Sequence, residues 1–110
     1  MKVVTLKKIE IYVDENGRKP FIEWLDSLKD KMGRYRIKER LDRIALGNFG
    51  DCKSISGGIS ELRCNFGPGY RVYFGEDDKK IVLLLCGGDK STQEKDIKKA
   101  TNYWKDYLLR

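Results

Sequence analysis

The apolar residues of the N-terminal third follow two different periods. Between residues 3 and 13 apolar and polar positions alternate loosely, which is typical of a β-strand, and residues 14–17 (DENG) predict a turn after it. From Pro20 the apolar residues recur instead at i, i+3, i+4 and i+7, which predicts a short helix with one buried face. The residues of this face are Phe21, Trp24, Leu25 and Leu28.

A second helix is predicted after residues 30–33, where helical spacing returns. Ile37, Leu41 and Ile44 form its buried stripe, while basic residues occupy the rest of its surface. Gly47 gives this helix a typical C-terminal end.

The period then changes to two in residues 59–66 (ISELRCNF) and 70–75 (YRVYFG), which the glycines of residues 67–69 (GPG) separate. These two segments predict a β-hairpin in which Phe66 pairs with Tyr70 across the turn. One face of this hairpin is apolar. The other face displays Glu61, Arg63, Asn65, Arg71 and Tyr73.

The last third of the chain predicts one buried strand and one helix. Residues 81–86 (IVLLLC) are apolar at every position, so they predict a central strand that is covered on both faces. Residues 91–94 (STQE) predict a capping box that opens the final helix. The buried stripe of this helix is Ile97, Ala100, Trp104 and Leu108. A chain of 110 residues predicts one domain, 1–110.

The charge of the chain is concentrated in its middle. The sequence carries 23 basic and 17 acidic residues, a net charge of +6, and residues 31–74 hold nine basic residues against four acidic ones. Arginine is commoner than lysine in this segment, and guanidinium groups suit phosphate, so the segment favours a polyanionic partner. A solvated basic helix is the alternative. The candidates for RNA binding are Arg34, Lys38, Arg43 and Asn65.

The sequence contains no histidine, and its three cysteines, Cys52, Cys64 and Cys86, form no CxxC pair. Histidine-based catalytic systems and His-ligated metals are therefore excluded, a zinc ribbon is unsupported, and we expect no metal and no cofactor. Two of the cysteines fall at core positions of strands, where a thiol behaves as a small apolar group. We also expect a cytoplasmic protein, because no segment has the apolar length of a signal peptide or a membrane span.

Six residues are candidates for catalysis by charge and proton transfer. The polar hairpin face holds more charged groups than a solvated strand needs, although Glu61 with Arg63 also fits an ordinary cross-strand pair. Lys90 follows two glycines and precedes a helix N-terminus, which suits an anion, and a plain turn is the alternative. Lys53 precedes the hairpin, where it also fits a surface lysine. The candidates are Arg71, Arg63, Lys90, Lys53, Tyr73 and Glu61.

The segments GNFGDCKSISGGISELRCNFGPGYRVYF and IVLLLCGGDKSTQEKDIKKA closely resemble the RelE/ParE superfamily of small bacterial toxins. Within it, the phage-derived, HigB-like addiction-module killer proteins are the most similar branch. The resemblance extends from about Pro20 to Leu108. It implies a compact RelE-like α+β domain, with a twisted antiparallel sheet, two N-terminal helices on one side of it and a C-terminal helix.

The resemblance also implies an endoribonuclease that cleaves mRNA, typically in the ribosomal A site, by attack of the ribose 2′-hydroxyl on the adjacent phosphate and without a metal. Arg71 in GYRVYF matches the family's transition-state arginine, while Arg63, Lys53 and Lys90 match basic positions of the ribonuclease members. Some relatives place a His or Tyr near the C-terminal end, and this chain has neither between residues 75 and 102, so the general acid is unassigned. The implied partner is a cognate antitoxin of helix-turn-helix type.

Two other functions stay open at this point. A toxin of the ParE branch inhibits DNA gyrase by binding and cleaves nothing itself. A non-catalytic basic module binds RNA or an acidic partner, with affinity that depends sharply on salt. The arginines of the hairpin face and the lysine after the glycines favour the ribonuclease.

Overall fold

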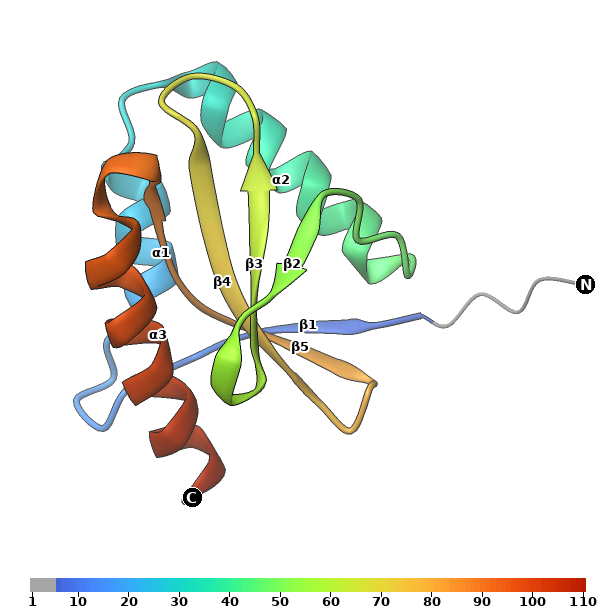
Figure 1. Ribbon diagram of the computed structural model, residues 1–110, viewed down its shortest axis with the longest axis vertical. Helices are drawn as coiled ribbons and strands as arrows, with labels where there is room; N and C mark the ends of the chain where they lie inside the picture. The colour runs from blue at the N-terminus through green and yellow to red at the C-terminus, as the bar shows by residue number, and fades with distance from the viewer. Residues whose placement is uncertain (1–5) are drawn as a thin grey trace, which may run out of the picture.

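The computed structural model describes residues 6–110, which form three α-helices and one five-stranded sheet (Figure 1). The strands are β1 (Lys8–Ile11), β2 (Cys52–Ser54), β3 (Ile59–Cys64), β4 (Tyr70–Asp77) and β5 (Ile81–Asp89). The helices are α1 (Pro20–Ser27), α2 (Lys31–Ala45) and α3 (Gln93–Leu108), and 3₁₀ turns span Ser56–Gly58 and Lys90–Thr92. The predicted α+β class is confirmed. Of the predicted first strand, residues 3–5 lie outside the described residues.

The strand order β1-β5-β4-β3-β2 brings the first and last strands of the sequence together. β1 runs parallel to β5, with Ile9 opposite Val82, whereas the other neighbouring strands are antiparallel. The sheet is therefore mixed, and β1 is the departure from the expected antiparallel arrangement. Because β5 is paired on both sides along residues 81–84, its continuous apolar run is explained.

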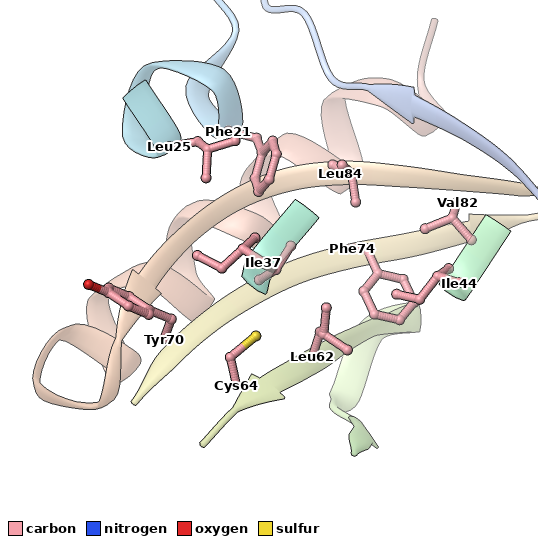
Figure 2. Close-up of a cluster of buried hydrophobic side chains, with 11 residues drawn as sticks. Phe21, Leu25, Ile37, Ile44, Leu62, Cys64, Tyr70, Phe74, Val82 and Leu84 are labelled. Carbon is pink, nitrogen blue, oxygen red and sulfur yellow. The ribbon is translucent and has the colours of Figure 1, made fainter. Parts of the chain in front are cut away.

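Helices cover both faces of the sheet. α1 and α2 lie on one face and α3 lies on the other (Figure 1). The core under α1 and α2 includes Phe21, Leu25, Ile37, Ile44, Leu62, Phe74 and Leu84 (Figure 2). The core under α3 includes Tyr12, Ile59, Tyr73, Leu83, Leu85, Cys86, Ala100 and Trp104. Among residues 6–110, none of the helices has the length and apolar character that a membrane crossing needs.

The β3–β4 hairpin differs from the prediction in its register. Cys64, not Phe66, lies opposite Tyr70, so five residues rather than three form the turn. The Gly69 N–H donates to the Phe66 carbonyl at 3.1 Å, and the ring of Phe66 leaves the strand to pack on that of Tyr70, 5.8 Å away. The shift is two residues, and because side chains alternate with a period of two, each strand residue keeps its predicted face.

A side-chain cap starts α2, and a capping box starts the 3₁₀ turn that leads into α3. The Asp30 carboxylate accepts from the Gly33 N–H at 2.8 Å and starts α2. Before α3 the capping box is formed by Asp89 and Thr92 around the 3₁₀ turn, not by residues 91–94 as predicted. The hydroxyl of Thr92 reaches the Asp89 N–H there at 3.2 Å, which tightens the entry into the helix.

The buried stripe of α3 ends one turn earlier than predicted. Trp104 is buried, but Leu108 is 57% exposed. Tyr107 takes the place next to the sheet instead, because its ring stacks on Trp104 and its hydroxyl donates to Asp77 of β4 at 2.7 Å.

Candidate functional site

Two rows of side chains cross the sheet on the face that α3 covers. In the first row Lys53 of β2 lies opposite Glu61 of β3, which lies opposite Tyr73 of β4. In the second row Arg63 of β3 lies opposite Arg71 of β4. Alternation along two strands therefore places these groups side by side, and β2 adds the lysine.

A cavity of about 330 Å³ opens between these rows and the start of α3. It is lined by Lys53, Ser54, Ile55, Glu61, Arg63, Arg71, Gln93 and Ile97, and we call it the basic cavity. Four of the six predicted catalytic residues are in this set. Three of the four are cationic and one is anionic, so the basic cavity has a formal charge of +2 and suits an anion such as phosphate.

Arg71 and Glu61 form the most buried ion pair of the described residues. Their side chains are 8% and 3% exposed, and Nε of Arg71 lies 3.6 Å from Oε1 of Glu61. This Nε has no hydrogen-bond partner among the described residues, while Nη1 donates to the Tyr70 carbonyl at 3.2 Å. Because buried polar groups are normally satisfied, an arginine this loosely bonded has donor capacity to offer a ligand.

Gln93 holds Glu61, the acidic member of this ion pair. The sequence did not predict this role for Gln93. Its Nε2 donates to Oε2 of Glu61 at 2.7 Å, from the first residue of α3. The contact joins residues that are 32 positions apart in sequence. No periodicity or motif in the chain indicated it, because it depends on which sheet face α3 covers.

Arg63 is held at the edge of the basic cavity by the loop that precedes β2. Its Nη2 and Nε lie 2.9 and 3.1 Å from Oδ1 of Asp51, and Nδ2 of Asn65 donates to Oδ2 at 2.8 Å. Hydrogen bonding by Asn65 and then by Arg63 lowers the pKa of the Asp51 carboxyl. Arg40 of α2 holds the backbone of Arg63 as well, because its Nη1 donates to the Arg63 carbonyl at 2.8 Å. Asn65 therefore orients Asp51 rather than lining the cavity, which differs from its predicted place on the strand face.

Tyr73 lies on the predicted face but does not reach the basic cavity. Its side chain is wholly buried beneath α3, and its hydroxyl has no hydrogen-bond partner of normal length among the described residues. Burial, followed by the negative charge of Glu61, raises the pKa of this phenol. The structure places Tyr73 in the core, so its predicted contact with substrate is not compatible with this geometry.

Lys90 lies outside the lining of the basic cavity but close to it. Gly69, in the hairpin turn, has a φ of 79°, and a Cβ at this residue would lie 3.4 Å from Cβ of Lys90 and 3.6 Å from Nη1 of Arg71. Both cationic side chains therefore border the same glycine. The side chain of Lys90 is exposed to solvent.

The basic residues of α2 are not part of this site. Arg34, Lys38 and Arg43 belong to the helix that covers the opposite face of the sheet. Arg34 is also engaged, because its Nη1 donates to the Leu28 carbonyl between α1 and α2. Their predicted role in RNA binding would therefore need a second contact surface.

The thiols lie in or near the two cores. Cys64 and Cys86 are buried, as the strand periodicity predicts, and burial raises the pKa of the Cys86 thiol to about 12. Burial likewise raises the pKa of the half-buried Cys52 thiol. Because the thiolate is the reactive form, these cysteines act as apolar packing groups. The chemistry of the basic cavity consequently rests on guanidinium, ammonium and carboxylate groups.

Comparison of the sequence with known proteins places the chain in a family. The sequence profile of the family described as "Phage derived protein Gp49-like (DUF891)" matches residues 23–105, which include α2, most of α3 and all strands except β1. An uncharacterized protein of Haemophilus influenzae is 52% identical over 80 residues, which cover 73% of this chain and 81% of the relative. The Gp49-like family is toxin-like, related to the RelE/HigB group and associated with the toxins of toxin–antitoxin systems. The chain belongs to the Gp49-like family of phage-derived proteins.

Proposed function

We propose that this protein is the toxin of a type II toxin–antitoxin pair, on the HigB-like branch, and that it is a metal-independent, ribosome-dependent endoribonuclease acting on mRNA. Membership of a toxin-like family supports the first part. The single observation that carries the second part is the basic cavity, in which Arg71 and Arg63 lie on adjacent strands beside the carboxylate of Glu61. Buried charged groups that converge on a cavity are typical of a binding or catalytic site.

In the proposed reaction the 2′-oxygen of a ribose forms a bond to the adjacent phosphorus. The bond between that phosphorus and the 5′-oxygen of the next nucleotide breaks, leaving a 2′,3′-cyclic phosphate and a 5′-hydroxyl. One proton leaves the 2′-hydroxyl and one is added to the departing oxygen. The phosphate gains negative charge in the transition state, which guanidinium donors in a partly dry cavity stabilise.

Each charged residue of the basic cavity has a separate role in this reaction. Arg71 and Arg63 bind the phosphate oxygens, and the Arg71 Nε that lacks a partner gains one. Once phosphate competes for Arg71, the carboxylate of Glu61 is free to accept the proton of the 2′-hydroxyl. Lys53, which lines the cavity, or Lys90, whose side chain borders the same glycine as Arg71, supplies the proton to the 5′-oxygen. The cognate antitoxin, a small DNA-binding protein of helix-turn-helix type, then blocks access to this face.

The test is induced expression in a bacterium, with mRNA 5′ ends mapped by primer extension in the presence and absence of translating ribosomes. New ends within codons only when ribosomes are present are the expected result. We expect Arg71→Ala to lower cleavage about 100- to 1000-fold, the usual loss on removal of one transition-state donor, and to abolish growth arrest. Lys105→Ala is the matched control, because it removes one positive charge from an exposed position of α3 that does not line the cavity.

Other outcomes would replace this proposal. Growth arrest by Arg71→Ala equal to that of the wild type would remove Arg71 from the mechanism. Intact mRNA together with inhibited gyrase supercoiling would assign the protein to the gyrase-inhibiting toxins. Salt-dependent RNA binding without any cleavage would leave a non-catalytic binding module.

A further inference from the structure

Two buried side-chain donors lack a hydrogen-bond partner among residues 6–110, and both belong to β4. One is Nε of Arg71, which lies 3.6 Å from Oε1 of Glu61. The other is the hydroxyl of Tyr73, a wholly buried residue that lies opposite Glu61 of β3. Because buried polar groups are normally satisfied, two unsatisfied donors next to the same acidic residue call for a common explanation.

The carboxylate of Glu61 has acceptor capacity left for another donor. Its Oε2 accepts from Nε2 of Gln93 at 2.7 Å, whereas the contact of Oε1 with Nε of Arg71, at 3.6 Å, is longer than a normal hydrogen bond. An ionised carboxylate accepts up to about four hydrogen bonds. Glu61 is almost wholly buried, so further bonds to this carboxylate come from the side chains around it or from a ligand.

The surroundings of Tyr73 keep its hydroxyl in the protonated, donating form. Burial raises the pKa of this phenol most, and the negative charge of Glu61 comes second. Asp96 of α3, Cys86 of β5 and hydrogen bonding to Glu61 raise it further. The contribution of hydrogen bonding places the hydroxyl on the side of the Glu61 carboxylate. At neutral pH Tyr73 is therefore a hydrogen-bond donor that faces an acceptor.

Asp96, the other carboxylate near Tyr73, is already bonded elsewhere. Its Oδ2 accepts from the Thr92 hydroxyl at 2.5 Å. It also lines a separate hollow of about 280 Å³ on the other flank of α3, where the charged residues are Asp89, Asp96 and Lys99 and the formal charge is −1. Glu61 is consequently the acceptor through which Tyr73 acts on the basic cavity.

We propose that Tyr73 is a positioning residue, whose hydroxyl donates to the Glu61 carboxylate when a phosphate draws Arg71 away. The proposal rests on the proposed function, in which Glu61 accepts the proton of the 2′-hydroxyl. A buried carboxylate that loses its cation needs another donor, and the Tyr73 hydroxyl is unused on the neighbouring strand. The new bond holds the carboxylate in one orientation while it accepts the proton. Tyr73 itself touches no substrate.

The contact is tested without any cleavage, by NMR of protein that carries ¹³C at Cζ of its six tyrosines. This nucleus responds to hydrogen bonding of the hydroxyl, and the Tyr73 signal is the one that is absent from Tyr73→Phe. We expect the signal to move when inorganic phosphate is added, and to have moved already, without phosphate, in Arg71→Ala. In Glu61→Leu, which has no acceptor, phosphate should leave the signal in place.

The positioning role is tested by kinetics on purified ribosomes. Tyr73→Phe should lower kcat for mRNA cleavage about tenfold and leave KM unchanged, because it removes one hydrogen bond to a charged group and no contact with substrate. On the acid side, cleavage should fall to half at a higher pH, since a carboxylate that has lost a donor holds a proton more readily. Tyr70→Phe is the matched control. It removes a hydroxyl from the same strand that bonds to Asp30 beside the other core, so kcat and the pH profile should stay unchanged.

A double variant separates positioning from a general loosening of the core. Once Glu61→Gln has removed the base, the addition of Tyr73→Phe should cost little further activity, and a fully additive loss would overturn the proposal. Equal kcat of Tyr73→Phe and wild type, an unchanged acid limb, or a Tyr73 signal that stays in place with phosphate or in Arg71→Ala would each overturn it as well. Wild-type protein that cleaves no mRNA would instead overturn the proposed function, and the ¹³C signals would still decide whether Tyr73 donates to Glu61.

Discussion

The Glu61–Arg71 pair shows what single residues contribute to this site. Both side chains are almost wholly removed from water, yet the closest N···O distance is 3.6 Å and the guanidinium Nε is unsatisfied. The desolvation of such a pair offsets most of its attraction, so a loose buried pair contributes little net stability. Beside a cavity, such a pair suits an arginine that is available to an anion better than a role in holding the fold together.

Gln93 is a positioning residue, because it holds the carboxylate of Glu61 and has no part in binding phosphate in the proposed reaction. Because it donates to Oε2 of Glu61, Gln93→Ala frees the carboxylate to rotate toward Arg71 and tighten the ion pair. We expect mRNA cleavage to fall about tenfold, equivalent to about 1.4 kcal/mol, with little change in the melting temperature. The measurement is cleavage of mRNA on purified ribosomes alongside thermal unfolding. Lys95→Ala, an exposed neighbour, is the control, and equal activity of Gln93→Ala and wild type would exclude the positioning role.

At the scale of elements, the start of α2 depends on its N-cap residue, Asp30. The Asp30 carboxylate accepts from the Gly33 N–H and from the Tyr70 hydroxyl, which lies 3.0 Å away on β4, and these bonds lower the pKa of Asp30. A carboxyl whose pKa is lowered by folding stabilises the protein above its unfolded pKa. That contribution is lost as the pH falls through the folded pKa.

This pKa shift gives a prediction for the start of α2. Asp30→Ala should lower the melting temperature at neutral pH, and the difference from wild type should narrow at an acid pH below the folded pKa of Asp30, where the wild-type carboxyl is protonated as well. Asp30→Asn keeps a capping oxygen and removes the titration, so it should melt near the wild type at neutral pH. Thermal unfolding at the two pH values measures both effects. A gap between Asp30→Ala and wild type that persists at low pH would contradict the assignment.

The elements also show why sequence reasoning succeeds in part. Period-two alternation placed Glu61, Arg63 and Arg71 on one face, because alternation survives a register shift of two residues. The stripe of Ala100 and Trp104 predicted that α3 buries one side, but a stripe does not state which sheet face receives it. Tertiary packing decides which sheet face α3 covers, and this packing alone brings Gln93 to Glu61 and covers Tyr73. The parallel pairing of β1 with β5 is likewise a long-range contact with no local signal.

At the scale of the whole molecule, glycines in the strands fix how the helices dock. Trp104 of α3 lies where a side chain at Gly75 of β4 would be, and Trp24 of α1 does the same at Gly87 of β5. These close approaches set α1 and α3 against opposite faces of the sheet and leave hollows on both flanks of α3. One hollow is cationic and the other anionic, so a single helix separates two surfaces of opposite charge.

This separation predicts how RNA binding depends on salt. For single-stranded nucleic acid, log K falls with log salt by about 0.7 for each phosphate contact. If RNA binds the face of the basic cavity, Lys53→Gln should reduce that slope by about 0.7, and Arg43→Gln, on the opposite face of the sheet, should leave it unchanged. A 2′-O-methyl oligonucleotide suits the titration, because it lacks the nucleophile and stays intact. Lys105→Gln controls for net charge. A slope that falls equally in Arg43→Gln would instead assign part of the RNA path to α2.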